Sequence, residues 1–277
     1  MSASPLDKYT ELRYNEKKTN REGGAVDIIQ TFYDNMAAQY DKLFQDWDAS
    51  VHEQAEILHR LFASCGYDSS ARLLDCACGI GTQAIGLAAL GYAVTASDIS
   101  LPELRRAEEN AARHGVSVRC AHADFRALSE TFTEPFDIVI AMDNALPHML
   151  TDAALETAVR SITGQLRQGG IFAASIRDYD SLLSCKPPYS PPYIHKNADG
   201  QRVSFQTWDW HGDCYHLVQY IIEDTGLPRI SKFECDYRAV RRSELSALLL
   251  ANGCKEVTWR MPEETGFYQP IATAVKA

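Results

Sequence analysis

The sequence lacks the features of a membrane or secreted protein. No apolar run reaches membrane-spanning length, and the N-terminus, MSASPLDKYTELRYNEKK, contains no apolar core of a signal peptide. The 8 cysteines include no C-x-x-C pair, which excludes the common spacing of zinc ligands, and they are too sparse for a disulfide scaffold. We therefore expect a cytoplasmic protein with reduced thiols and without a metal site.

The chain also has few basic residues. Its 27 Lys and Arg residues stand against 37 Asp and Glu residues, for a formal net charge of −10, and no basic cluster interrupts this balance. Binding to a nucleic acid requires a positively charged face. A small molecule is the expected partner, with no nucleic acid and no membrane.

What is present is the composition of a globular protein. A hydrophobic fraction of 45% and a charged fraction of 23% exclude a disordered chain, and 277 residues suit one α/β domain with an insertion. Residues 1–24 are polar and weakly periodic, which predicts a flexible tail. Residues 25–66 carry apolar side chains at helical spacing and begin the single domain that we expect over residues 25–277.

Strand-like and helix-like segments then alternate. Parallel strands require crossover helices, so this alternation predicts an α/β fold with a doubly wound, mostly parallel sheet. The runs FDIVIAM and IFAASI lack polar alternation, as expected for central strands that are covered on both faces. The predicted strands are 71–77, 93–98, 116–120, 136–142 and 171–176, and the predicted helices are 50–63, 82–90, 101–114 and 152–167.

A different pattern begins after Arg177. The Pro-rich stretch KPPYSPPY is followed by strand-like runs at 202–210, 214–224 and 229–238, separated by short turns. This pattern predicts an antiparallel β-meander, inserted over residues 178–238 as a cap on the substrate side. A helix at 241–252 and a hairpin formed by 255–261 and 270–277 would complete a seven-stranded main sheet.

A glycine-containing loop, Asp75-Cys-Ala-Cys-Gly-Ile-Gly-Thr, follows the first predicted strand and opens a helix. Gly79 and Gly81 permit close approach of a ligand to the backbone at a helix N-terminus. Asp98 ends the next strand, where a carboxylate can accept hydrogen bonds from both hydroxyls of a ribose. The other interpretation is an ordinary strand-to-helix turn, with Asp98 as the N-cap of the following helix.

The loop differs from a dinucleotide fingerprint because the third glycine is missing from its usual place. Asp75 is also unsuited to a pyrophosphate, because a carboxylate repels phosphates but attracts an ammonium group. A nucleoside cofactor with an amino-acid end fits both observations.

With LLDCACGIGT, VTASDIS, HADF and FDIVIAMDNALPHM, the sequence resembles the class I S-adenosylmethionine-dependent methyltransferases. The resemblance implies a Rossmann-like methyltransferase fold, S-adenosylmethionine as cofactor, S-adenosylhomocysteine as product, and adenine contacts from Asp124 and Phe125. Core packing remains an alternative for Phe125, and the aromatic segment 32–48 is either a lid over the cofactor or an amphipathic packing helix. The cofactor-binding residues predicted on this basis are Tyr33, Tyr40, Trp47, Asp75, Ala77, Gly79, Gly81, Asp98, Ile99, Asp124, Phe125 and Met142.

The acceptor side is predicted from strand ends. Arg177 follows an apolar central strand at the carboxyl edge of the sheet, where its guanidinium can bind a carboxylate in a fork. Asn144 and His148 follow the neighbouring strand and can face the same crevice. The alternatives are a surface ion pair of Arg177 with Asp178 or Asp180 and a purely structural role for His148.

A narrower resemblance, carried by ACGIGT, DNALPHM, IRDYDSLL and the meander, is to the glycine and sarcosine N-methyltransferases. It implies that Arg177 and Asn144 hold the carboxylate and amine of a small amino acid, with Tyr33, Tyr40, Tyr193, Tyr220 and Tyr237 as candidates to close over the methyl group. No general base is required for an amine that arrives neutral. The catalytic set predicted here is Asn144, Arg177, Tyr40, Tyr220 and His148.

Three functions are compatible with these residues. The first is methyl transfer to the amine of glycine, sarcosine or a related carboxylate-bearing molecule. The second is methyl transfer to another small or aromatic acceptor, for which Trp208, Trp210, Tyr215 and Tyr220 would form a larger, flatter pocket. The third is non-catalytic binding of S-adenosylmethionine. The aromatic meander is also a candidate surface for a homodimer.

Overall fold

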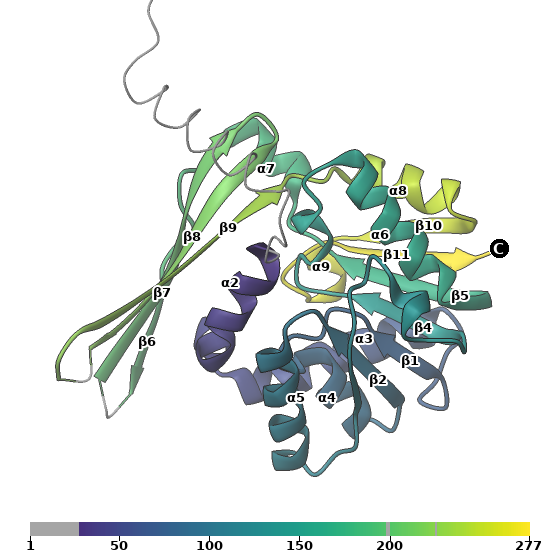
Figure 1. Cartoon of the computed structure of the whole chain (residues 1–277), viewed down its shortest axis with the longest axis horizontal. Helices are drawn as coiled ribbons and strands as arrows, with labels where there is room; N and C mark the ends of the chain where they lie inside the picture. Colours follow the sequence, from purple (N-terminus) through teal and green to yellow (C-terminus); the bar gives the residue numbers. More distant parts are fainter. Residues whose placement is uncertain (1–27, 198–199, 225) are drawn as a thin grey trace, which may run out of the picture.

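The computed structural model describes residues 28–197, 200–224 and 226–277. The predicted tail, residues 1–24, and the first residues of the predicted lid lie outside this part of the chain. A seven-stranded sheet with helices on both faces forms the main body, and a four-stranded antiparallel sheet extends away from it (Figure 1). The two-part architecture confirms the predicted α/β fold with an inserted antiparallel sheet.

The main sheet is parallel except for one strand near its edge. Its order is β10-β11-β5-β4-β1-β2-β3, and only β11 runs antiparallel to its neighbours. The order reverses between β1 and β4, and ligands bind beside such a switch point at the carboxyl ends of the strands. The strands are β1 (Arg72–Asp75), β2 (Ala93–Asp98), β3 (Arg119–His122), β4 (Phe136–Ala141), β5 (Leu166–Ser175), β10 (Cys254–Arg260) and β11 (Ile271–Lys276).

Helices cover both faces of this sheet. In β4, Ile138 and Ile140 pack with α3 and α4, whereas Val139 and Ala141 pack with α6 and α8. Successive residues of β4 therefore face opposite sides of the sheet, and both sides are covered by apolar side chains. This explains why FDIVIAM has no polar alternation. The covering helices are α3 (Trp47–Ser64), α4 (Thr82–Ala89), α5 (Leu101–Arg113), α6 (Asp152–Gly164) and α8 (Arg242–Ala251).

The inserted sheet has the order β6-β7-β8-β9 and all its pairs are antiparallel. We predicted three strands here, and the structure adds β6, which is short and directly follows Pro191 and Pro192. A run of five residues is too short to show a clear alternation of apolar and polar side chains, and neighbouring prolines are more typical of a loop than of a strand. The strands are β6 (Tyr193–Asn197), β7 (Gly200–His211), β8 (Cys214–Asp224) and β9 (Arg229–Arg238).

Other elements also differ from the prediction. Two short helices, α7 (Tyr179–Cys185) and α9 (Pro262–Thr265), were not expected, because one or two turns carry too little periodicity. The helix predicted to reach residue 167 ends at Gly164, and Leu166 instead begins β5 by pairing with Phe136. Pairing with a neighbouring strand is a long-range contact that a local apolar pattern does not reveal.

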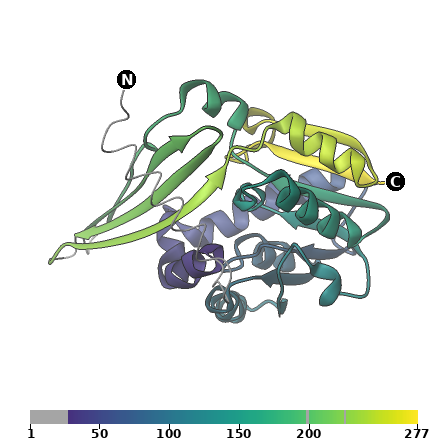
Figure 2. The same cartoon turned by 45° about the horizontal axis from the view of Figure 1, so that its top comes forward.

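The N-terminal helices lie between the two sheets (Figure 1). α2 (Ile28–Met36) buries Phe32 and Met36 against the inserted sheet, and the 3₁₀ helix η2 (Ala37–Leu43) continues from it along α5. In the turned view this segment lies beneath the long strands of the inserted sheet (Figure 2). Within the described ranges, no helix is both long and apolar enough to cross a membrane.

Candidate active site

Two adjoining cavities lie at the carboxyl edge of the parallel strands. The first is lined by the Cys76–Gly79 loop, the end of β2, and the segments after β3 and β4. The second is lined by the N-terminal helices, the inserted sheet and Arg177, and has a volume of about 670 Å³. Tyr33, Tyr40 and Asp143 line both, so these side chains mark the boundary at which groups bound in the two cavities would meet.

The first cavity is shaped by Gly79. Its φ of +52° is a left-handed conformation, and a Cβ atom there would lie 3.1 Å from Oε2 of Glu103. The Gly79 amide donates a 2.9 Å hydrogen bond to Oδ2 of Asp98, which joins the loop to the end of β2. A glycine is therefore needed both for the turn and for the open space beside Glu103.

Asp98 occupies the predicted position at the end of β2 and lines the first cavity. Its other oxygen, Oδ1, accepts from the Ser100 amide at 2.9 Å, and burial raises the pKa of this carboxyl group. The N-cap of α5 is Ser100, whose hydroxyl accepts from the Glu103 amide. The capping alternative for Asp98 is thus wrong, and its remaining acceptor capacity faces the cavity.

Asp75 lies directly behind the cofactor loop and does not line the cavity. It is fully buried, Oδ1 accepts only a long bond of 3.4 Å from the Ala77 amide, and Oδ2 has no hydrogen-bond partner among the described residues. Burial raises its pKa to about 8. A buried acceptor without a donor is costly, so the loop retains capacity for a donor or a positive charge.

Glu103 is a cavity residue that the sequence analysis missed. It is buried, lines the first cavity, and its Oε1 has no hydrogen-bond partner among the described residues. Burial raises its pKa well above the usual value, and the nearby Asp98 adds to this effect. The S-x-x-E spacing from Ser100 is an available signal, because it places Glu103 in the first turn of α5, directly after Asp98 at the end of β2.

The remaining predicted cofactor residues divide into two groups. Ala77, Ile99, Asp124, Phe125 and Met142 line the first cavity, as do Tyr33 and Tyr40. The Asp124 carboxylate is already held by Arg126, with an Nε–Oδ2 distance of 2.7 Å. Gly81 and Trp47 are absent from the lining: Gly81 has a φ of +93° and packs against Ile85, where a Cβ atom would lie 2.8 Å from that side chain.

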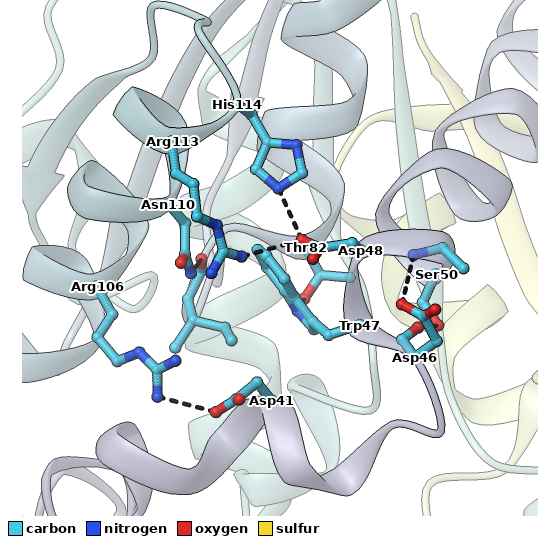
Figure 3. Close-up of polar contacts among 12 residues, drawn as sticks. Asp41, Asp46, Trp47, Asp48, Ser50, Thr82, Arg106, Asn110, Arg113 and His114 are labelled. Atoms are coloured by element: carbon cyan, nitrogen blue, oxygen red, sulfur yellow. Dashed lines mark hydrogen bonds and ion pairs between the residues drawn. The ribbon is translucent and has the colours of Figure 1, made fainter. Parts of the chain in front are cut away.

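Trp47 contacts the residue that follows the Cys76–Gly81 loop and does not reach the cavity itself. Its Nε1 donates a 3.0 Å hydrogen bond to Oγ1 of Thr82, the first residue of α4, which lines the first cavity. Figure 3 shows the surrounding contacts, in which Arg106 of α5 binds Asp41 and Arg113 binds Asp48, each at 2.9 Å. The predicted direct contact of Trp47 with the cofactor is therefore replaced by a supporting contact, because its indole is buried against Ile80, Ile85 of α4 and Ala111 of α5.

Replacing Trp47 by Phe is expected to lower the free energy of unfolding by about 1 kcal/mol, because the Thr82 hydroxyl loses its buried donor. Affinity for S-adenosylhomocysteine, measured by calorimetry, should fall by only about threefold. Thr82→Val removes the other partner of the bond. If the two substitutions were fully additive in denaturant unfolding, the bond would not contribute to stability.

Arg177 lies in the second cavity among aromatic rings. Its Nη1 donates to the Tyr215 hydroxyl at 2.6 Å and its Nη2 to Oε1 of Gln206 at 2.8 Å. Its Cζ lies 4.9 Å from the centroid of the Trp208 ring, which favours a cation. Among the described residues no carboxylate pairs with this guanidinium.

The alternative of a surface ion pair for Arg177 is wrong. Asp178 and Asp180 pair instead with Arg242, at 2.5 and 3.3 Å. The chain turns into α7 directly after Arg177, and both acidic side chains bind Arg242 at the start of α8, while Asp178 also lines the second cavity. Because neither aspartate pairs with it, the Arg177 guanidinium can bind the carboxylate of a ligand in the second cavity.

Asn144 contacts Arg177 across the strand ends. Its Oδ1 accepts from the Arg177 amide and from the Tyr179 hydroxyl, each at 3.1 Å. Its Nδ2 is buried and has no hydrogen-bond partner among the described residues. The amide can therefore donate to a bound acceptor, as the prediction for Asn144 requires.

The other predicted catalytic side chains fall on both sides of the site. Tyr40 lines both cavities, and Tyr193 and Tyr237 line the second. His148 lines the first, where its Nε2 is 2.8 Å from the Tyr33 hydroxyl. Tyr220 lines neither cavity, because side chains alternate along β8 and it lies on the face opposite Tyr215, stacked on Phe205.

Comparison with known proteins agrees with this geometry. A protein-family model described as a methyltransferase domain matches residues 73–170. The chain is 28% identical to a glycine/sarcosine N-methyltransferase of Aphanothece halophytica over 55% of this chain and 56% of that protein. It is 32% identical to a malonyl-[acyl-carrier protein] O-methyltransferase of Pseudescherichia vulneris over 69% of this chain and 64% of that one.

The matches thus span between about half and two thirds of the length of these curated relatives. Among solved structures, the CcbJ methyltransferase of Streptomyces caelestis superposes with a TM-score of 0.72 at 20% identity, covering 91% of this chain and all of that one. The family match covers the cofactor loop and the parallel strands, and the fold extends it to the edge of the sheet. The chain therefore belongs to the class I S-adenosylmethionine-dependent methyltransferases.

Proposed function

We propose that this chain transfers a methyl group from S-adenosylmethionine to the amine of a small, carboxylate-bearing molecule. The observation that supports this proposal most directly is the pair of adjoining cavities that meet at Tyr33 and Tyr40. One cavity is built from the family's cofactor segments. The other contains the guanidinium of Arg177, which donates hydrogen bonds to two uncharged side chains, Tyr215 and Gln206.

The first cavity has the chemistry that a cationic nucleoside requires. Buried acceptor atoms of Asp75 and Glu103 have no hydrogen-bond donor among the described residues. Asp98 and Glu103 would accept from the ribose hydroxyls, and Asp75 would stabilise the ammonium of the amino-acid end. When bound, S-adenosylmethionine supplies an electrophilic methyl group on a positively charged sulfonium.

Glu103 offers a test of this cofactor assignment. Glu103→Gln should weaken binding of S-adenosylhomocysteine about tenfold, because an amide has one acceptor oxygen where the carboxyl group can offer two. The loss should disappear for at least one of the 2′-deoxy and 3′-deoxy analogues, since each lacks one hydroxyl.

Glu108→Gln, an exposed change on the same helix, is the matched control and should bind like the parent chain. Titration calorimetry measures all three proteins. An equal loss of affinity for the full nucleoside and for both deoxy analogues would exclude contact between Glu103 and the ribose.

The residues of the second cavity have separate roles. Arg177 would orient the acceptor carboxylate, and the free Nδ2 of Asn144 would donate to the same molecule. The N-terminal helices and the inserted sheet cover the junction of the cavities and exclude water from it. A methyl transfer needs little more than this alignment, because the donor is already activated.

The test is an acceptor panel with isotopically labelled S-adenosylmethionine and detection of the labelled product. Glycine and sarcosine lead the panel because the relative from Aphanothece halophytica carries these names. Each amino acid is paired with its amide and its methyl ester, which lack the carboxylate. Product from the acids but not from their amides or esters is expected. Binding of S-adenosylmethionine without product from any acceptor would support the non-catalytic alternative.

A second candidate is a larger acceptor. The cavity volume of about 670 Å³ greatly exceeds the needs of glycine, and Trp208, Phe205 and Tyr193 provide apolar surface in its lining. Of the residues first considered for such a pocket, Trp210 donates to the Pro187 carbonyl, and neither it nor Tyr220 lines the cavity. A higher kcat/KM for N-benzylglycine or phenylalanine than for glycine would favour this candidate.

A further inference from the structure

We propose that Asp143 receives the ammonium group of the acceptor and takes the proton that must leave before the amine can attack. This inference rests on the proposed function and adds a residue that the family resemblance did not supply. Asp143 follows β4 and lines both cavities. It is therefore a carboxylate at the boundary where the acceptor nitrogen and the methyl group would meet.

The side chain of Asp143 is held in one orientation. Its Oδ1 accepts from the Tyr268 hydroxyl at 2.6 Å, and its Oδ2 accepts from Nε2 of Gln83 at 2.8 Å. Its own amide donates to Oγ of Ser175 at 2.8 Å. Each carboxylate oxygen keeps a second lone pair, so the group is positioned and still able to accept from an ammonium.

The backbone at this point is strained. Asp143 and Asn144 both have positive φ, 56° and 69°, in a region that non-glycine residues rarely adopt. Such conformations are unfavourable by themselves and persist where the surrounding structure requires them. Here the strain directs two consecutive polar side chains from one strand end into the site.

Asp143 and Arg177 present opposite charges to the same cavity. They follow β4 and β5, which pair in parallel with Ala141 opposite Ala174, so both emerge at one edge about 5 Å apart between strands. Asn144 lies between them and accepts from the Arg177 amide. A zwitterion could therefore place its carboxylate at Arg177 and its ammonium at Asp143.

The surroundings make Asp143 a better base than a free carboxylate. Burial raises its pKa, and the hydrogen bonds from Tyr268 and Gln83 oppose that rise. The other titratable groups facing it are Tyr40 from η2, Asp75 from β1 and Arg177 from the end of β5. A bound ammonium next to Asp143 would favour the ionised form of this carboxyl group.

The proposed step is balanced without another reactant. One N–H proton passes from the acceptor ammonium to a carboxylate oxygen of Asp143, which leaves a neutral amine with a free electron pair. That pair forms the new N–CH₃ bond while the S–CH₃ bond breaks and its electrons stay on sulfur. The methylated product carries the positive charge, and Asp143 returns its proton to solvent.

A binding experiment tests the ammonium contact without turnover. With S-adenosylhomocysteine present, calorimetry compares glycine with propionate, in which a methyl group replaces the ammonium, and phenylalanine with 2-methyl-3-phenylpropanoate. The parent chain should prefer the amino acid of at least one pair by about tenfold or more, and Asp143→Asn should lose most of that preference. Affinity for S-adenosylhomocysteine should change less than about twofold.

The pH dependence of turnover tests the proton transfer. For Asp143→Asn we expect kcat/KM to fall about 100-fold at pH 7 and to recover toward high pH, where the amine is already neutral. Tyr268→Phe removes a hydrogen bond that lowers the pKa of Asp143, so the acidic limb of its profile should move to higher pH. Glu56→Gln, an exposed carboxylate of α3 that lines neither cavity, is the control and should leave the profile unchanged.

Two results would overturn the inference. The first is that the Asp143→Asn chain still prefers the amino acid over the analogue without an ammonium group. The second is that this variant instead loses affinity for S-adenosylhomocysteine, which would assign the carboxylate to cofactor binding. Failure of the proposed function gives a different pattern, because then the parent chain itself converts no amine in the acceptor panel.

Discussion

Arg177→Gln is expected to lower kcat/KM for every carboxylate-bearing acceptor by about 1,000-fold, with little change in affinity for S-adenosylhomocysteine. The guanidinium is partly buried in the second cavity, and its bonds to Tyr215 and Gln206 fix its orientation. An acceptor carboxylate without this partner would be desolvated and unpaired, at a cost of about 4 kcal/mol. Steady-state kinetics and calorimetry measure the two quantities separately.

Arg177→Lys is the matched control for charge. A lysine keeps the positive charge but cannot contact Tyr215 and Gln206 in a fork, so an intermediate loss of about 30-fold is expected. The amide of the best acid substrate should give no product with the parent chain or with either variant. Equal kcat/KM values for acid substrates in the parent chain and in Arg177→Gln would contradict the assigned role.

Asp75→Asn is expected to raise the free energy of unfolding of the unliganded chain by about 2 to 4 kcal/mol near pH 8, and by little near pH 4. The pKa of Asp75 is about 8 in the folded chain, against 3.8 for an aspartate in water. Between these values the unfolded state releases the proton while the folded state retains it. Stability therefore declines as pH rises from about 4 to 8, and asparagine removes that decline.

The measurement is denaturant unfolding at a series of pH values. Asp137→Asn is a control of opposite sign, because bonds to Arg72 and Arg167 lower the pKa of Asp137 and its contribution is lost as pH falls. The Asp75→Asn chain should also bind S-adenosylmethionine at least tenfold more weakly. A pH-independent effect on stability would show that the folded Asp75 is ionised.

The main sheet was predictable because its information is local. Central strands such as β4 and β5 are apolar on both faces, and the helices α4, α5 and α6 connect successive strands, so alternation alone indicates a parallel sheet. The edge hairpin of β10 and β11 was also predicted. The short elements α7, α9 and β6 were not, because their sequences carry prolines or a single turn and their stability comes from neighbours.

The same distinction separates the two halves of the site. Gly79 and Asp98 are found from sequence because each follows a strand in a fixed local pattern, and the structure joins them by one hydrogen bond. Tyr220 was misplaced because one residue of uncertainty along a strand reverses the face of a side chain. Glu103 was missed because its pattern also describes an ordinary helix cap.

The sequence by itself determined the class of fold and the site of the methyl donor. Both depend on residues close together in the chain, where a strand, a glycine turn and a helix follow one another. Only the tertiary structure decided which groups face the acceptor. Arg177, Gln206 and Tyr215 meet through pairing of distant strands, as do Asp143 and Tyr268, which are 125 residues apart. Such contacts result from packing between separate elements, and no local pattern encodes which side chain each element presents.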